Sequence, residues 1–315
     1  MTTKKILITG GAGFIGSKLC TKLVTLGYKV TVIDNFMYGA SSINHLHQNK
    51  NFNLIEGDIN KLKFSKKFLK NYDFIIPLAA LVGAPLCDKN KKLSIQTNVN
   101  SLKKILKNIQ TSHKIIYPTT NSGYGIGEKN KFCTENTPLN PISLYGKTKS
   151  EAEELVMKHK NSVSFRLATV FGYSYRMRTD LLVNFMTKEA VRKKKLVIYE
   201  PNFRRNFIHI DDVVDAFIFS INNFKKVKGN VFNLGLSSAN ITKIKLARKI
   251  KKYVKDLKIN IDENGTDPDK RDYIVSNKKI EKTGFKARVS LDKGIIELVK
   301  VFSFSKNDYI NNYNI

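Results

Sequence analysis

ILITGGAGFIG, residues 6–16, decides the fold. It starts as a short apolar run and passes through Gly10, Gly13 and Gly16, which are spaced GxxGxxG and lead into helical periodicity. Glycines at these positions permit a tight turn, a close approach of the backbone to a pyrophosphate, and close packing of the helix on the strand. The helix N-terminus then faces the anion. Because the pattern lies between a strand and a helix, we expect a phosphate-binding turn rather than an ordinary one.

The sequence after this turn alternates short apolar runs with longer amphipathic runs over about the first 170 residues, which is typical of parallel strands and crossover helices. We therefore predict an α/β fold, a Rossmann-type doubly wound parallel sheet. The expected strands are Lys5–Ile8, Lys29–Ile33, Phe52–Glu56, Phe74–Pro77, Lys114–Tyr117 and Ser162–Leu167, and the expected helices are Gly16–Leu26, Thr97–Gln110 and Tyr145–His159.

The alternation loosens beyond Gly172, which predicts a smaller, mixed C-terminal lobe. We expect residues 1–172 to hold a dinucleotide and residues 173–315 to bind the substrate, with some segments of the second part returning to the sheet. The end of the chain, Asn307–Ile315, has the composition of a polar tail. Further elements are expected at Leu181–Lys194, Asp211–Asn222, Thr242–Tyr253 and Leu291–Phe302 as helices and at Val231–Leu234 as a strand.

Composition limits the partners of the chain. The formal net charge is +29, yet only nine of the 55 basic residues are Arg, and the Lys are scattered rather than gathered in a stripe. This favours a solvated surface that attracts anionic metabolites over a nucleic-acid partner. No leader or membrane-spanning run is visible, so we expect a cytoplasmic location without membrane contact. The three cysteines are widely spaced and indicate neither disulfides nor a metal site.

A carboxylate at the end of the second expected strand indicates the cofactor. Asp34 lies eighteen residues after Gly16, where it can accept the hydroxyls of an adenosine ribose and would repel a 2′-phosphate. No Arg follows nearby in the sequence to receive such a phosphate. NAD is therefore favoured over NADP.

A tyrosine and a lysine four residues apart form the expected catalytic pair. Tyr145 and Lys149 open a helix and share one face of it. A nearby ammonium and the positive nicotinamide would favour the phenolate, which makes the tyrosine a usable base. The preceding strand ends in hydroxyl residues, and Thr120 is placed to hold the reacting hydroxyl.

These features together resemble the extended short-chain dehydrogenase/reductase family, whose members act on nucleotide-sugars. The resemblance is carried by the glycine motif, Asp34, Asp58-Ile59, Leu78-Ala79-Ala80, Asn98, Thr120, Tyr124-Gly125 and the Tyr145–Lys149 pair. It implies that Asp58 reaches the adenine amino group, that Leu78–Ala80 lines the cofactor, and that the helix carrying Asn98 supports the site. The cofactor-binding residues it implies are Gly10, Gly13, Phe14, Ile15, Gly16, Asp34, Asn35, Asp58, Ile59, Leu78, Ala79, Ala80, Asn98, Tyr145 and Lys149.

The resemblance also implies a homodimer and a set of substrate contacts. The helices at Thr97–Gln110 and Tyr145–His159 would build a four-helix dimer interface, although their apolar positions equally fit core packing. Arg205 and Arg271 match diphosphate clamps, since the guanidinium fork suits phosphate, while structural ion pairs are the alternative. The expected substrate-binding residues are Asn121, Ser122, Arg178, Arg205 and Arg271.

Neighbours of Thr120 narrow the reaction. The family's 4,6-dehydratases carry Asp-Glu directly after this threonine, whereas this chain has Asn121-Ser122. Enzymes that epimerise C3 or C5 carry a Cys two residues before the tyrosine matching Tyr124, and Ser122 stands there. Oxidation or reduction at C4, or 4-epimerisation, remains.

Four longer stretches resemble the GDP-heptose 4-dehydrogenases of bacterial capsule pathways, which oxidise C4 of GDP-D-glycero-D-manno-heptose. They are residues 77–87, 121–128, 166–172 and 235–240, and they depart from ordinary UDP-hexose 4-epimerases. The alternatives are a nucleotide-sugar 4-epimerase and, outside enzymes, an NAD-binding redox sensor or scaffold.

Overall fold

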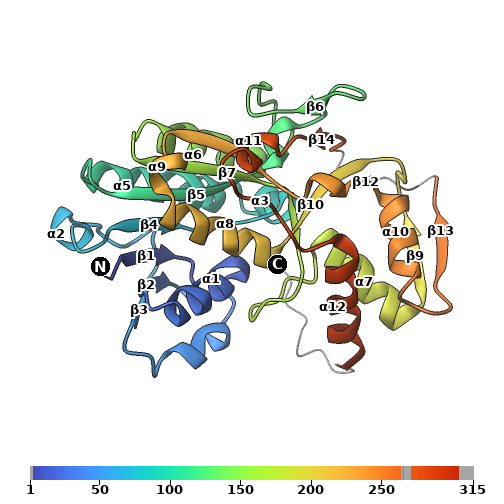
Figure 1. Cartoon of the computed structure of the whole chain (residues 1–315), viewed down its shortest axis with the longest axis horizontal. Coiled ribbons are helices and arrows are strands. Elements are labelled where there is room, and N and C mark those ends of the chain that lie inside the picture. Colours follow the sequence, from blue (N-terminus) through green and yellow to red (C-terminus); the bar gives the residue numbers. More distant parts are fainter. Residues whose placement is uncertain (1–2, 264, 266–270, 305–315) are drawn as a thin grey trace.

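A parallel seven-stranded sheet forms the centre of the computed structural model, which describes residues 3–263, 265 and 271–304 (Figure 1). The strand order is β11-β7-β5-β4-β1-β2-β3, which confirms the predicted doubly wound sheet. The polar tail expected at Asn307–Ile315 lies outside the described residues. The strands are β1 (Lys5–Thr9), β2 (Lys29–Asp34), β3 (Phe52–Glu56), β4 (Phe74–Pro77), β5 (Lys114–Thr120), β7 (Ser162–Leu167) and β11 (Asn230–Leu234).

Strand alternation explains how the sheet is covered on both faces. Ile6 and Ile8 of β1 are fully buried in a cluster with residues of α1 and α8, whereas Leu7 packs in another cluster with Ile105 of α5. Successive side chains of a strand point to opposite faces, so a continuous apolar run requires helices on both sides. Figure 1 shows α1 and α8 on one side of the sheet and α5 and α6 on the other. The helices are α1 (Phe14–Thr25), α2 (Lys66–Leu69), α3 (Ala84–Lys89), α4 (Lys91–Ile95), α5 (Ser101–Asn108), α6 (Leu144–Met157), α7 (Leu182–Lys193), α8 (Ile210–Asn222), α9 (Phe224–Val227), α10 (Lys243–Lys251), α11 (Lys278–Glu281) and α12 (Leu291–Phe304).

The second half of the chain contributes to both parts of the fold. Strand β11, expected at Val231–Leu234, pairs in parallel with β7 and completes the large sheet. The remaining strands form small sheets. In Figure 1, β9 and β13 lie with α10 on the right, and β6 and β14 lie at the top. They are β8 (Thr169–Phe171), β10 (Arg204–His209) and β12 (Asn240–Thr242) in one sheet, β9 (Lys195–Ile198) with β13 (Lys258–Ile261), and β6 (Phe132–Cys133) with β14 (Ile274–Val275).

The helix expected at Thr97–Gln110 differs from the prediction. Helical structure begins at Lys91 with α4, passes through a π-helical turn, η2 (Gln96–Asn100), and continues as α5. The wider turn holds an extra residue, and within it the amide of Asn98 bonds the backbone N–H and C=O of Leu81 at 2.8 and 3.0 Å. The 3-10 turns are η1 (Ser41–Leu46), η3 (Asn121–Tyr124) and η4 (Ser237–Ala239).

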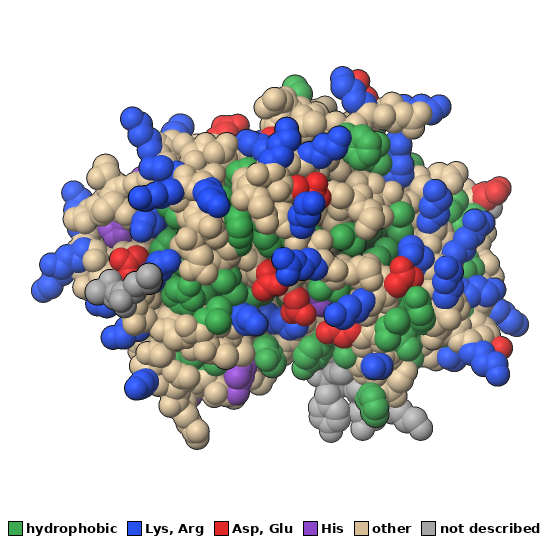
Figure 2. Space-filling view, in the orientation of Figure 1, with side chains coloured by type: hydrophobic (Ala, Val, Ile, Leu, Met, Phe, Trp, Pro, Cys, Tyr) green, Lys and Arg blue, Asp and Glu red, His purple; other side chains and the backbone are tan. Residues whose placement is uncertain are grey.

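The surface is basic but mixed. On the face in Figure 2, Lys and Arg are spread over the whole outline, with Asp and Glu among them. Within the described ranges, no helix is long and apolar enough to cross a membrane. The three cysteines are buried free thiols.

Candidate active site

A cavity of about 340 Å³ lies at the carboxyl ends of the central strands, where open parallel sheets bind ligands. Its wall contains all but one of the cofactor residues expected from the sequence. These are Gly10, Gly13, Phe14, Ile15, Gly16, Asp34, Asn35, Asp58, Ile59, Leu78, Ala79, Ala80, Tyr145 and Lys149.

The glycine turn leaves no room for side chains at two positions. Gly10 has φ +75°, and a Cβ atom there would lie 2.5 Å from the backbone nitrogen of Ala79. A Cβ atom on Gly16 would lie 2.3 Å from the carbonyl oxygen of Gly10. Helix α1 therefore starts close against β1, and its positive end, with no acidic residue in the first turn, is suited to a pyrophosphate.

Asp34 ends β2 in the wall of the cavity. Its carboxylate accepts hydrogen bonds from the backbone N–H groups of Ala12 and Phe36, each at 2.9 Å. Burial raises the pKa of this carboxyl, and the backbone hydrogen bonds and the charge of Arg176 oppose that shift.

Arg176 corrects the inference that no Arg lies near Asp34. No Arg follows Asp34 closely in the chain, but Arg176 lies in the wall of the same cavity, 4.1 Å from the ring centroid of Tyr38. The segment that carries Arg176 contacts the start of α1, because Ser174 Oγ donates to the carbonyl of Phe14 at 2.6 Å. The sequence carries no local signal for this approach, since the two segments lie far apart along the chain.

Lys149 contacts a tyrosine other than the expected one. Its side chain is 4% exposed, and Nζ donates to the hydroxyl of Tyr117 at 2.6 Å. Burial lowers the pKa of Lys149 to about 7, opposed by the charge of Glu153. From the sequence we expect this ammonium at the phenol of Tyr145. In the structure it bonds Tyr117 of β5 instead.

Tyr145 lies beside cations from the second half of the chain. Burial raises the pKa of its phenol to about 12, and Arg178, Arg271 and a hydrogen bond with Thr120 oppose that shift. Burial therefore outweighs these groups and disfavours the phenolate, contrary to the expectation from the sequence, and the opposing charge with the largest effect is that of Arg178. Arg178 itself is paired with Asp180 and lines the cavity.

The turn after β5 brings Thr120 and Arg271 together. Thr120 Oγ1 accepts from the N–H of Ser122 at 3.1 Å and lies 2.9 Å from its hydroxyl. Arg271, which follows a segment outside the described residues, donates to the same Ser122 hydroxyl. The structure thus gathers Thr120, Ser122, Tyr145, Arg178 and Arg271 at one end of the cavity.

Six expected residues lie outside the wall of the cavity. Three of them, Thr120, Ser122 and Arg271, are the neighbours of Tyr145 described above, and the others are Asn98, Asn121 and Arg205. Asn98 is buried behind the cavity and holds the Leu81 backbone, so it supports the cofactor-lining segment. Asn121 is 1% exposed. Arg205 is buried on β10, 5.9 Å from the ring centroid of Tyr273.

A family model, the NAD dependent epimerase/dehydratase family, matches residues 6–235, from the glycine motif to the end of β11. The chain belongs to this family. It is an NAD-dependent enzyme of the nucleotide-sugar epimerase/dehydratase type, which confirms the cofactor expected from the glycine turn and Asp34.

Relatives resemble the chain over two thirds to nearly all of its length. UDP-glucuronate 4-epimerase 4 of Arabidopsis thaliana is 27% identical and is matched over 94% of this chain and 74% of its own length. Protein CapI of Staphylococcus aureus is 31% identical over 240 residues, 67% of each chain.

Solved structures show the same fold. The UDP-glucuronic acid 4-epimerase of Bacillus cereus, in complex with UDP-glucuronic acid and NAD, superposes with a TM-score of 0.83 at 27% identity, covering 95% of this chain and 99% of that one. The UDP-N-acetylglucosamine 4-epimerase of Methanobrevibacter ruminantium has a TM-score of 0.85 at 24% identity, covering 96% and 99%.

Proposed function

We propose that the protein oxidises the C4 hydroxyl of a nucleotide-sugar to a ketone. The observation that carries this proposal is the position of Tyr145, which lines the dinucleotide cavity, shares a hydrogen bond with Thr120 and lies near the cations Arg178 and Arg271. This arrangement combines a base, an orienting hydroxyl and groups for an anionic substrate at one end of an NAD cavity.

Each residue then has one task. Tyr145 takes the proton of the C4 hydroxyl while Thr120 orients that hydroxyl. NAD, held by the glycine turn and Asp34, would supply the hydride acceptor and a positive nicotinamide that favours the phenolate. Lys149, which bonds Tyr117 in this structure, would hold the nicotinamide ribose. The electron pair leaves with the hydride and the proton leaves through the phenolate, so the sugar loses two hydrogen atoms.

The residues after Thr120 argue against dehydration as the next step. Asn121 and Ser122 occupy the positions where an acid and a base would be needed, and neither side chain titrates near neutral pH. The 4-keto sugar is therefore the product that leaves, or it is reduced again in the same site.

GDP-D-glycero-D-manno-heptose is the substrate we propose. Its support is the resemblance of residues 77–87, 121–128, 166–172 and 235–240 to GDP-heptose 4-dehydrogenases of capsule pathways. The second candidate is 4-epimerisation of a UDP-sugar, which is favoured by the names of the relatives.

A homodimer through α5 and α6 is part of the proposal. The exposed sides of these helices carry the ion pair Lys103–Glu151 at 2.9 Å, which links α5 to α6. Light scattering of the purified protein would decide between monomer and dimer.

The experiment adds GDP-D-glycero-D-manno-heptose or UDP-glucuronic acid, in separate samples, to the NAD-loaded protein, and follows reduced nicotinamide and product mass. Nicotinamide reduction with loss of two hydrogens from the heptose supports the dehydrogenase. A UDP-sugar isomer of unchanged mass supports the epimerase.

Tyr145→Phe should bind NAD but reduce none of it. Tyr253→Phe is the matched control, because this exposed tyrosine bonds Asp292 on the surface. Full activity of Tyr145→Phe would refute the assigned base.

A further inference from the structure

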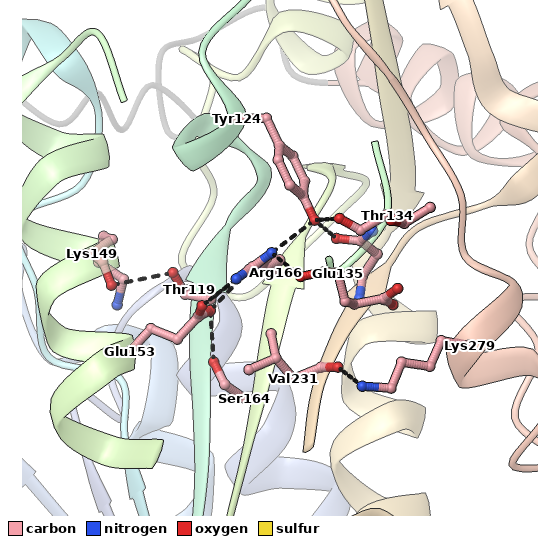
Figure 3. Close-up of polar contacts among 11 residues, drawn as sticks. Thr119, Tyr124, Thr134, Glu135, Lys149, Glu153, Ser164, Arg166, Val231 and Lys279 are labelled. Carbon is pink, nitrogen blue, oxygen red and sulfur yellow. Dashed lines mark hydrogen bonds and ion pairs between the residues drawn. The ribbon is translucent and has the colours of Figure 1, made fainter. Parts of the chain in front are cut away.

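A buried chain of polar groups runs behind the active site (Figure 3). At its centre is Arg166 of β7, whose Nε and Nη2 donate to the carboxylate of Glu153 at 3.1 and 2.8 Å. The side chains are only 9% and 5% exposed. On its other side, Nη1 donates to the hydroxyl of Tyr124 at 3.0 Å and to the carbonyl of Glu135 at 3.2 Å.

The chain continues from Tyr124 to β11. The hydroxyl of Tyr124 lies 2.6 Å from Oδ1 of Asn233. Nδ2 of Asn233 donates to the carbonyls of Cys133 and Ser276, so its Oδ1 is an acceptor for the tyrosine proton. The carbonyl of Thr134, 3.0 Å from the same hydroxyl, is the other acceptor. The hydroxyl of Tyr124 thus accepts from Arg166 and has two acceptors for its one proton.

The two ends of this chain belong to the elements that carry the reacting groups. Glu153 lies four residues after Lys149 on α6, on the same face of the helix. Tyr124 ends the η3 turn, which begins directly after Thr120 and contains Ser122.

The segment that Asn233 bonds through Ser276 connects to the substrate lobe. Ser276 follows β14, whose pairing with β6 runs beside Cys133. The same stretch begins at Arg271, whose guanidinium bonds the hydroxyl of Ser122. Asn233 therefore bonds the same stretch of chain that carries Arg271.

Stability alone does not account for a charged pair at this depth. Burying two charges costs desolvation that apolar packing of similar volume avoids. The pair instead fixes the positions of Glu153 and Tyr124 relative to each other, because the planar guanidinium donates in set directions to the carboxylate and the hydroxyl. The charge of Glu153 also favours the ammonium form of Lys149 by raising its pKa against the effect of burial.

We propose that Arg166 and Tyr124 are positioning residues, and that the chain Glu153–Arg166–Tyr124–Asn233 holds the Thr120 turn at a fixed distance from Tyr145 and Lys149 on α6. This inference rests on the proposed oxidation at C4. It assigns the relative placement of base and orienting hydroxyl to a network that touches neither NAD nor sugar.

Tyr124→Phe tests the link, because it removes the hydroxyl between Arg166 and Asn233 and keeps the ring. We expect the kcat of C4 oxidation to fall at least about tenfold, since misplacement of reacting groups by about 1 Å can cost 10²-fold. The Kd for NAD should stay within about twofold of wild type, because the cofactor wall is untouched. Arg166→Lys keeps the charge but not the fork, and should behave like Tyr124→Phe.

Ser164→Ala is the matched control. Ser164 Oγ donates to Oε2 of Glu153 at 3.2 Å, so the variant removes a bond from the same network without touching the η3 turn. It should keep wild-type kcat. Wild-type kcat in Tyr124→Phe would overturn the proposal, as would a parallel loss of kcat, NAD affinity and thermal stability.

Hydrogen exchange supplies a readout that does not depend on turnover. Amides 119–126 should exchange at least about tenfold faster in Tyr124→Phe than in wild type, while Ser164→Ala leaves them unchanged. If the wild-type protein oxidises no nucleotide-sugar, the proposed function fails. The exchange rates then still decide whether the chain holds the turn, and unchanged rates in Tyr124→Phe refute that.

Discussion

Lys149 should make the NAD-stripped protein less stable at neutral pH than at alkaline pH. Burial lowers its pKa from 10.5 to about 7, so between these values the unfolded state binds more protons than the folded state. The free energy of unfolding therefore rises with pH in this window. The destabilisation is complete below the folded pKa and disappears above the unfolded one.

The magnitude follows from the two pKa values. Integration of proton binding gives a penalty of about 4 kcal/mol at pH 7 and about 2 kcal/mol at pH 9, a gain of about 2 kcal/mol. Lys149→Met removes the titrating group at similar volume, and the lost hydrogen bond to Tyr117 adds a term that is the same at both pH values.

Urea unfolding of both proteins, stripped of NAD, at pH 7 and pH 9 measures the effect. Titration of other groups is common to the two chains and cancels in the comparison. From pH 7 to pH 9, the free energy of unfolding of the wild-type protein should rise by about 2 kcal/mol more than that of Lys149→Met. Equal gains would refute the claim that Lys149 is a desolvated ammonium.

Three further predictions concern the cofactor and the charge. Gly16→Ala should weaken NAD binding at least about tenfold, because its Cβ would clash with the Gly10 carbonyl. In the same NAD titration Gly13→Ala should lose less affinity, because its Cβ would lie 3.2 Å from the nearest atom. Asp34→Asn should shift preference toward NADP, because Arg176 remains in the wall of the same cavity; an unchanged ratio of the NAD and NADP Kd values would contradict this. Raising ionic strength should lower kcat/KM for a nucleotide-sugar, because a net charge of +29 steers anions at low salt; salt-independent kcat/KM would exclude steering.

Local patterns account for the part of the site that was predictable. The glycine turn and Asp34 are read from short spacings whose geometry is imposed by a strand, a turn and a helix. Tyr145 and Lys149 follow from one helical turn. Each of these residues lines the cavity, because the physical constraint acts within a few neighbouring residues.

Contacts between distant segments were beyond such patterns. The acceptor for Lys149 is Tyr117, thirty-two residues earlier, and Arg176 reaches Asp34 from the other half of the chain. The placement of a cation inside a cavity depends on which side chains compete for it after packing. The early start of the helix at Lys91 was also missed, because its first turn is polar and shows no apolar stripe.

Completion of the sheet by β11 has a consequence for synthesis of the protein. Until Leu234 has left the ribosome, one edge of the fully buried strand β7 has no partner. Translation at roughly 5–20 residues per second means that the nascent chain waits about 3–13 s between the end of β7 and the arrival of β11. During that interval the unpaired N–H and C=O groups of the β7 edge are available to other chains, so aggregation of nascent protein should be governed by this late strand rather than by the dinucleotide turn.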